Sequence, residues 1–260
     1  MKDKGIHLGG TARSPDDVIT LHRLGLAFAE IGVPDPERFA PLVPRYREVN
    51  RELGLYFLAH GPREGNPNDI PGLENRYLPK ILHLLELVQA LNIPLLTIHL
   101  WMDPRFVRPK TIAYKMDFLK RVIQRAAEKG ITVCLENLSE NAIHLGPVFR
   151  ALPDLYLTLD LGHAQLLTEE NTSFGFFDQH RDRIRHIHLH DNRGGNSPED
   201  DLHLPVGEGD IDFEKIFAKM MAADYSGTIT LELKPGEIEG CLGYVKRLLG
   251  PLLKREASPA

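Results

Sequence analysis

Three histidines alternate with aliphatic residues in the segment IRHIHLHDN, residues 184–192. Successive side chains of a β-strand point to opposite faces, so His186, His188 and His190 share one face and the two aliphatic side chains between them share the other. Imidazoles bind metals and transfer protons. A single strand histidine is more often a hydrogen-bonded polar residue than a ligand. The chemical interpretation therefore depends on the rest of the chain.

Strand-like apolar runs recur along the chain at intervals of roughly thirty residues, which is the length of one strand, loop and helix unit. Eight such runs begin at Gly5, Gly25, Leu55, Pro94, Ile131, Leu155, Ile184 and Thr228. The segments between them have helical periodicity, as in YKMDFLKRVIQRAAEKG. Eight alternating units predict a (β/α)8 TIM barrel. A doubly wound open sheet is disfavoured because no GxGxxG turn follows the first run.

The length and composition set further limits. A chain of 260 residues is typical of a barrel that forms a single domain, 1–260, and we expect only 251–260 to be a frayed tail. A net charge of −5 gives no excess of positive charge for nucleic acid or an anionic membrane. The two cysteines predict no disulfide framework. The absence of a signal-peptide pattern or a membrane-length apolar run leads us to expect a cytoplasmic protein without membrane contact.

Each run can be divided into side chains that would point into the barrel and side chains that would point to the helices. In almost every run, the inward row of side chains ends in a residue that can bind a metal. These residues are His60, His99, Glu136, Asp160, His188 and Glu232. The carboxyl ends of barrel strands meet at one face, where barrel active sites are built. Buried carboxylates and imidazoles are costly unless they are paired or bind a cation. The pattern therefore predicts a metal site at this face.

Other candidate residues follow the strands closely. His163 lies three residues after Asp160, and the loop after the seventh run carries Asp201 and His203. Substrate contacts are expected from a histidine that we place at the end of the first strand, an aromatic ring, an amide and two cations near strand ends. These residues are His7, Trp101, Asn137, Arg193 and Lys234.

The motifs CLEN, TLDLGH, HIHLHD and LELK resemble those of the xylose isomerase-like barrels, over nearly the whole chain. That family includes sugar and sugar-phosphate isomerases and epimerases, and also endonuclease IV. The resemblance to the epimerases implies one divalent ion, Mn, Co or Zn, held by Glu136, Asp160, His188 and Glu232. Glu136 and Glu232 would then move protons next to a carbonyl whose enediolate the metal stabilises.

Endonuclease IV resembles the chain at more positions, because its three zinc ions use nine ligands. The resemblance implies a first zinc on His60 and His99 with Glu136 bridging to the second. The second zinc would take the four ligands named above, and His163, Asp201 and His203 would hold the third. However, CLENLSENAIHLG lacks the glycine-rich turn of the endonuclease, and HLPVGEGDIDF is similar to the isomerase members.

We therefore expect a metal-dependent isomerase or epimerase of a sugar or sugar phosphate. An apurinic/apyrimidinic-site phosphodiesterase with three zinc ions and DNA as its partner is the alternative. A third hypothesis is a non-catalytic barrel that binds a metal or a sugar. The helices of such barrels often form dimer surfaces, so a homo-oligomer also stays open.

Overall fold

A computed structural model describes residues 5–253 and contains eight parallel strands in a closed barrel. Each strand pairs with its neighbours in sequence, and β1 pairs with β8 to close the barrel. The strands are β1 (His7–Ala12), β2 (Phe28–Gly32), β3 (Tyr56–His60), β4 (Leu95–Ile98), β5 (Thr132–Glu136), β6 (Tyr156–Asp160), β7 (Ile184–Leu189) and β8 (Thr228–Leu231). Each of the eight strand-like runs of the sequence overlaps one of these strands, which confirms the predicted single-domain TIM barrel.

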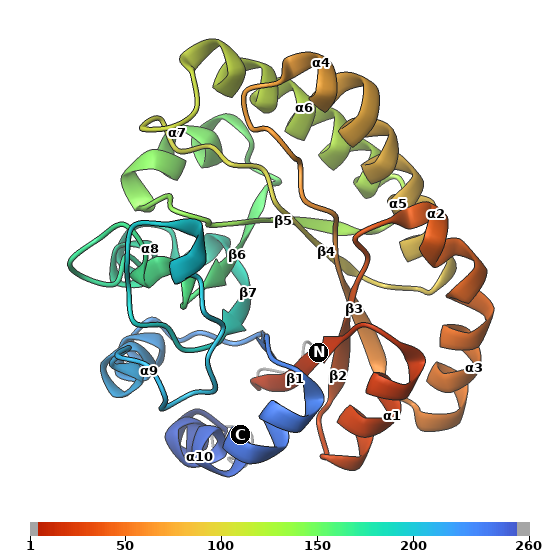
Figure 1. Ribbon diagram of the computed structural model, residues 1–260, viewed down its shortest axis with the longest axis vertical. Coiled ribbons are helices and arrows are strands. Elements are labelled where there is room, and N and C mark those ends of the chain that lie inside the picture. Colours follow the sequence, from red (N-terminus) through yellow and green to blue (C-terminus); the bar gives the residue numbers. More distant parts are fainter. Residues whose placement is uncertain (1–4, 254–260) are drawn as a thin grey trace.

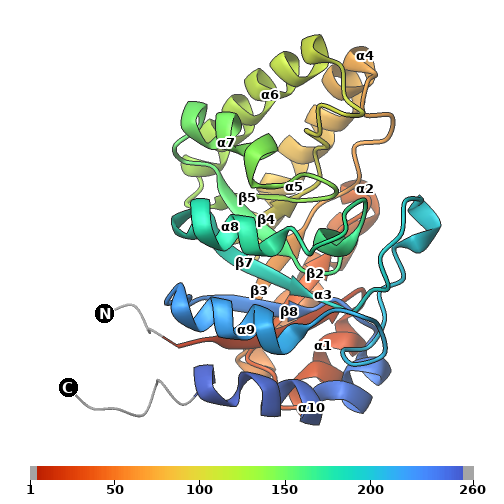
Figure 2. The ribbon, with the colours of Figure 1, turned by 90° about the vertical axis from the view of Figure 1, so that its left-hand side faces the viewer.

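Helices form a ring around the strands (Figure 1). They are α1 (Pro15–Arg23), α2 (Pro36–Phe39), α3 (Val43–Leu53), α4 (Ile70–Gly72), α5 (Leu78–Ala90), α6 (Pro109–Ala127), α7 (Ala142–Ala151), α8 (Ser173–Gln179), α9 (Phe213–Ala222) and α10 (Pro235–Leu253). Figure 2 shows β7 pointing toward the side from which the loop that follows it projects. Within residues 5–253, no helix combines the length and the apolar character that a membrane span requires.

The two faces of each strand serve different purposes, as β6 illustrates. Leu157 and Leu159 are fully buried in the large core between the barrel and the helices. Thr158 lies between them and shares a hydrogen bond of 2.8 Å with Thr97 of β4, inside the barrel. A small apolar cluster of Phe28, Leu58, Leu95 and Cys134 lies apart from the large core. The inward-facing side chains fill the barrel near the amino ends of the strands. Polar side chains line it toward the carboxyl ends.

Two sequence predictions need correction. His7 begins β1 and does not end it, so it lies at the face opposite the carboxyl ends of the strands. Its Nδ1 is 2.9 Å from the hydroxyl of Tyr56, the first residue of β3. The error arose because the run GIHLGG continues as strand to Ala12. Of the predicted frayed tail, residues 251–253 close α10, and residues 254–260 lie outside the described residues.

Candidate metal centre

The six predicted strand-end residues meet at the mouth of the barrel, together with the three predicted loop residues. The side chains fall into adjoining groups whose ligand atoms lie within 4.8 Å of one another. Three of these groups are His60, His99 and Glu136; Glu136, Asp160, His188 and Glu232; and His163, His190, Asp201 and His203. All nine residues predicted as metal ligands are therefore brought together, from positions spread between β3 and β8.

The central group is built around His188 of β7. Its Nδ1 lies 3.4 Å from Glu136, 3.6 Å from Asp160 and 3.5 Å from Glu232. The side chains of Glu136, Asp160 and His188 are fully buried, whereas that of Glu232 is 19% exposed. Three carboxylates and one imidazole form a mixed oxygen and nitrogen set, which suits Mn, Co or Zn.

Glu136 belongs to two groups because its two carboxylate oxygens face different histidines. Oε2 accepts hydrogen bonds from His60 Nε2 at 3.0 Å and from His99 Nε2 at 2.8 Å. Oε1 lies 3.2 Å from Nδ1 of His163 and faces His188. A carboxylate with both oxygens directed at separate groups has the arrangement of a bridging ligand.

The outer group lies on the loops that follow β6 and β7. Oδ2 of Asp201 is 3.3 Å from Nε2 of both His163 and His203. His190 is buried and stacks on His203 with ring centres 3.9 Å apart. His203 has a positive φ of 47°, an uncommon conformation for a residue with a side chain. Backbone strain of this kind is often retained at functional sites.

These residues fit a divalent ion because several of their polar atoms are buried and make no hydrogen bond. Among the described residues, Glu136 Oε1, His188 Nδ1, Glu232 Oε2 and Asp201 Oδ1 are buried without a hydrogen-bond partner. Such orphaned atoms are rare in folded proteins and point to a missing ion or water. Three of the four belong to the central group, and the fourth belongs to the outer group.

The charges of the centre lead to the same conclusion. Burial alone would raise the pKa of the Glu136 carboxyl, but the positive charges of His99 and His188 hold it well below its usual range. Burial would lower the pKa of His203, but its hydrogen bond to Asp201 raises it to about 9. The buried carboxylates remain ionised and require positive charge nearby, which protonated histidines or a metal ion supply.

Glu30 of β2 is a participant that the sequence reasoning missed. Its side chain is buried, and it accepts hydrogen bonds from His188 Nε2 at 3.0 Å and from His186 Nε2 at 3.1 Å. His186 thus lies one layer deeper in the barrel than His188. The only signal was an acidic residue inside the apolar run GLAFAEIG, whose two faces otherwise look alike.

Two residues near β6 support the side chains of these groups. The amide of Asn137 donates to the carbonyl of Asp160 at 3.0 Å and accepts from its N–H at 2.8 Å, so it fixes the end of β6. This use of both amide atoms disagrees with the prediction that Asn137 contacts substrate. Gly162 leaves room for His190, since a Cβ at this position would lie 2.0 Å from the imidazole Cε1.

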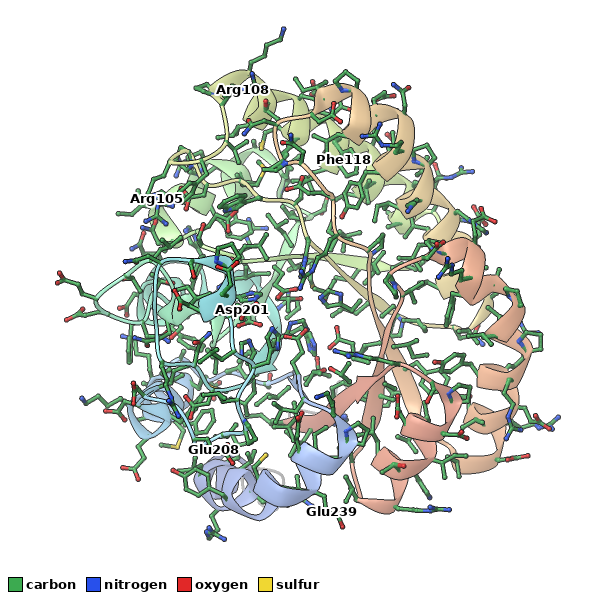
Figure 3. All side chains as sticks on the ribbon, in the orientation of Figure 1. Arg105, Arg108, Phe118, Asp201, Glu208 and Glu239 are labelled. Atoms are coloured by element: carbon green, nitrogen blue, oxygen red, sulfur yellow. The ribbon has the colours of Figure 1, made fainter. Side chains whose placement is uncertain are left out.

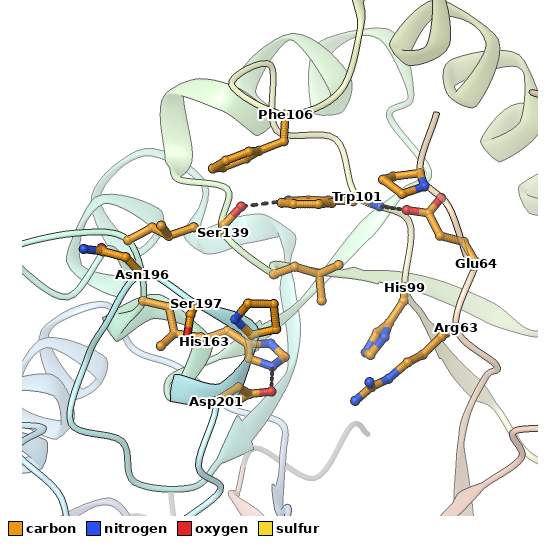
Figure 4. Close-up of a pocket in the computed structure, with 16 residues that line it drawn as sticks. Arg63, Glu64, His99, Trp101, Phe106, Ser139, His163, Asn196, Ser197 and Asp201 are labelled. Atoms are coloured by element: carbon orange, nitrogen blue, oxygen red, sulfur yellow. Dashed lines mark hydrogen bonds and ion pairs between the residues drawn. The ribbon is translucent and has the colours of Figure 1, made fainter. Parts of the chain in front are cut away.

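A cavity of about 560 Å³ opens beside the ligands (Figure 4). His99, His163 and Asp201 form part of its wall, and the predicted substrate residue Trp101 forms another part. The predicted residues Arg193 and Lys234 are exposed and lie outside the lining of this cavity. Arg193 donates to the carbonyl of Glu208, and Lys234 pairs with Glu237. Of the five predicted substrate residues, Trp101 alone lines this cavity.

Comparison with known proteins identifies the family. The sequence profile of the xylose isomerase-like TIM barrel matches residues 19–245. The chain belongs to this family. One relative, Uncharacterized protein MJ1188 of Methanocaldococcus jannaschii, is 30% identical over 192 residues, which cover 69% of this chain and 67% of that protein. Uncharacterized protein MJ1614 of the same organism is 29% identical over a segment that covers 47% of this chain and 48% of that protein.

Solved structures of other family members share the fold at low sequence identity. A D-tagatose 3-epimerase-like protein matches with a TM-score of 0.80 and 20% identity, covering 96% of this chain and 100% of its own. A D-allulose 3-epimerase from Methylomonas sp. has a TM-score of 0.78 and 18% identity, and the match covers 94% of this chain and 98% of that chain. A xylose isomerase domain protein from Planctomyces limnophilus has a TM-score of 0.77 and 18% identity, with 94% and 96% covered.

Proposed function

We propose that the chain is a divalent-metal-dependent isomerase or epimerase of a sugar or sugar phosphate. The observation that carries this proposal is the central group of Glu136, Asp160, His188 and Glu232, in which three buried ligand atoms have no hydrogen-bond partner. His99, which is bonded to Glu136 of this group, lines a cavity of small-molecule size. The shared fold with solved sugar epimerases supports the same assignment.

A divalent ion held by the central group would polarise a substrate oxygen and stabilise the charge of an enediolate. The two glutamates then differ in their freedom to move a proton. The side chain of Glu232 is 19% exposed, and its only charged neighbours within 4 Å among the described residues are His188, His190 and His203. We assign the first proton transfer to Glu232, because it is the more exposed of the two glutamates.

Glu136 is the candidate for the second proton transfer. It is fully buried, and its Oε2 is held by His60 and His99. These hydrogen bonds favour the ionised carboxylate and make it a weak base. We therefore propose that Glu136 acts first as a ligand, and that it exchanges a proton only through the histidines that contact it.

Arg63 supports an anionic substrate. It lies three residues after β3, it lines the cavity, and Figure 4 shows its guanidinium pointing to the space below His99. A guanidinium binds a phosphate or carboxylate through two parallel hydrogen bonds. A sugar phosphate is therefore the form of substrate that this wall favours.

The deciding experiment measures metal content and hydrogen exchange on one preparation. Protein purified without chelators is analysed for metal per chain and then incubated with candidate sugars and sugar phosphates in D₂O. We expect bound Mn, Co or Zn and metal-dependent deuterium uptake next to a carbonyl, observed by NMR. Glu232→Gln should reduce exchange by at least about 100-fold, as loss of a general base does. Glu208→Gln, on an exposed loop outside this cavity, is the control. Metal without exchange on any candidate would instead support the non-catalytic barrel.

Phosphodiester hydrolysis is the second candidate, and the bridging geometry of Glu136 favours it. The ten residues of the three groups could hold several ions, which would clamp the attacking and leaving oxygens of a phosphate ester. Close to three zinc ions per chain and nicking of abasic DNA would establish this function in place of the first.

The rim of the barrel argues against DNA as the substrate. Arg105 is bound to Asp103, and Arg108 is bound to Asn68. Both arginines lie toward the periphery of the molecule, away from Asp201 at its centre (Figure 3). Cations that are already paired contribute little to phosphate binding, which depends on free Lys and Arg side chains. A small substrate is therefore the better match to this face.

A further inference from the structure

The cavity beside the metal ligands has two chemically different halves. One half is bounded by His99, His163 and Asp201, together with Arg63. The other half is lined by apolar side chains from four loops, namely Pro67, Trp101, Phe106, Leu138, Leu166 and Leu167. A volume of about 560 Å³ is in the range of pockets that hold a drug-sized ligand. A sugar at the metal ligands would therefore leave the apolar half to another group.

Two polar side chains that border the apolar half, those of Glu64 and Ser139, already have partners within the protein. Glu64 accepts from the backbone N–H of Trp101 at 2.8 Å and pairs with the buried Lys115 at 2.7 Å. Ser139 Oγ accepts from the indole N–H of Trp101 at 2.7 Å and donates to Asp103 at 2.8 Å. Sugar hydroxyls placed here would lose their hydrogen bonds to water and gain few in return. A group without hydroxyls loses nothing.

Trp101 presents a fixed aromatic surface to this space. Its backbone N–H and its indole N–H are both bonded, so the ring cannot easily turn. Phe106 stacks on it with ring centres 4.9 Å apart and an angle of 24° between the planes. Figure 4 shows Phe106 on one side of the indole, and His99 with Arg63 on the other. An aromatic surface held in place before binding favours a planar partner.

Leu167, on the loop after β6, lines the cavity in an unfavourable backbone conformation. Its φ is 56°, in the left-handed region that residues with a Cβ seldom adopt. Its N–H donates to the carbonyl of Gly195 at 2.8 Å, which joins the loop after β6 to the loop after β7. Strain at a ligand-lining residue is retained where the surrounding structure enforces it. Here it holds an apolar side chain against the cavity.

We propose that the apolar half binds a planar aromatic ring attached to the sugar, so that the substrate is an aromatic glycoside or a nucleotide whose sugar part carries the carbonyl group, and not a bare sugar. This inference rests on the proposed function, because the sugar part must lie at the metal ligands. A phenolic aglycone and a nucleobase share the required chemistry: each offers a flat face to Trp101 and is attached to a sugar.

The test compares matched ligands that differ only in the ring. Phenyl β-D-glucoside is compared with methyl β-D-glucoside, and adenosine 5′-phosphate with ribose 5-phosphate, by calorimetry on the metal-loaded protein. Trp101 is the only tryptophan of the chain, so its fluorescence reports ring binding directly. We expect the ring-bearing member of one pair to bind at least about 10-fold more tightly and to change this fluorescence. The pair that responds identifies the source of the ring.

Two variants locate the effect. Leu167→Asn introduces a residue that tolerates a positive φ and makes this part of the cavity polar. Phe106→Leu alters a side chain that is 42% exposed. Each should reduce the preference for the ring without changing the affinity for the ring-free ligand. Ile143→Asn, at an exposed position on α7 outside the cavity, is the control.

Equal affinities within both pairs, or no binding by either ring-bearing ligand, would overturn the inference. The proposed function is tested separately by metal content and deuterium exchange. A ring preference in a protein that catalyses no exchange would leave the aromatic subsite standing and reject the isomerase. Exchange on bare sugars without a ring preference would support the isomerase and reject the aromatic subsite.

Discussion

His188 has two ring nitrogens, and Glu30 binds one of them. The hydrogen bond from Nε2 to Glu30 leaves Nδ1 directed at Glu136, Asp160 and Glu232. A carboxylate behind a metal-binding histidine fixes the ring and raises its basicity. We predict that Glu30→Gln weakens metal affinity about 10- to 100-fold, measured by competition with a chelator of known affinity.

Thr158→Val provides the control for this prediction. It removes the buried hydrogen bond to Thr97 inside the barrel without touching a ligand group. Its metal affinity should match that of the unchanged protein even if its stability falls. An affinity in Glu30→Gln equal to that of Thr158→Val would show that Glu30 does not position His188.

Gly162 gives a second prediction at the residue scale. A Cβ would lie 2.0 Å from Cε1 of His190, a contact that the buried ring cannot relieve by a small movement. Gly162→Ala should therefore cost about 1–3 kcal/mol of unfolding free energy in urea, as overpacking does. Gly240→Ala in α10 meets no atom within 4 Å and should be neutral or slightly stabilising. Equal effects of the two substitutions would contradict the packing argument.

Sequence reasoning found the strand-end residues that meet at the barrel mouth because inward rows that end in His, Asp or Glu have no apolar explanation. It missed Glu30, since a single acidic residue in an apolar strand does not reveal which buried imidazole it will meet. It misplaced His7, because the direction of a strand is known from sequence but its first and last residues are not. Contacts between distant strands decide both questions.

At the scale of elements, the loop between β4 and α6 is held by a network around Asp103. Its carboxylate receives Arg105 Nη2 at 2.7 Å and Ser139 Oγ at 2.8 Å, and Ser139 in turn holds Trp101. The strands were predictable from apolar runs of regular spacing, whereas this loop was not. Its shape depends on side chains from two neighbouring connections.

This network predicts a pH dependence of stability. Burial alone would raise the pKa of Asp103, but the hydrogen bonds from Arg105 and Ser139 hold it below its usual range. A carboxyl with a lowered folded-state pKa stabilises the protein above its unfolded pKa, about 3.9, and loses this contribution as the pH falls through the folded value. Asp103→Asn should therefore reduce the unfolding free energy by about 1–3 kcal/mol at pH 7.

The difference between Asp103→Asn and the unchanged protein should shrink below about pH 4, as urea denaturation at several pH values would show. Asp178→Asn, which breaks only a surface pair with Lys219, should change stability by less than about 0.5 kcal/mol. A pH-independent cost in Asp103→Asn would mean that the lost contribution comes from packing and not from charge.

At the scale of the whole molecule, the barrel gathers seven histidines and five carboxylates into adjoining groups at one end. Ions bound there stabilise the folded state and not the unfolded chain. We predict that removing the metal with a chelator lowers the melting temperature. Readdition at about 100 times the dissociation constant should restore about 2.7 kcal/mol per independent site. Calorimetry with and without chelator measures this, and an unchanged melting temperature would contradict it.

Closure of the barrel also orders events in time. The ligands extend from His60 to Glu232, so they surround a common point only after β3 and β8 have both joined the sheet. Contacts between residues so distant in the chain form late in folding. A metal that binds after that step cannot speed up folding. It acts by slowing the unfolding of the closed barrel. The loaded protein should therefore refold at the rate of the metal-free protein and unfold far more slowly, which would make the metal a determinant of its lifetime.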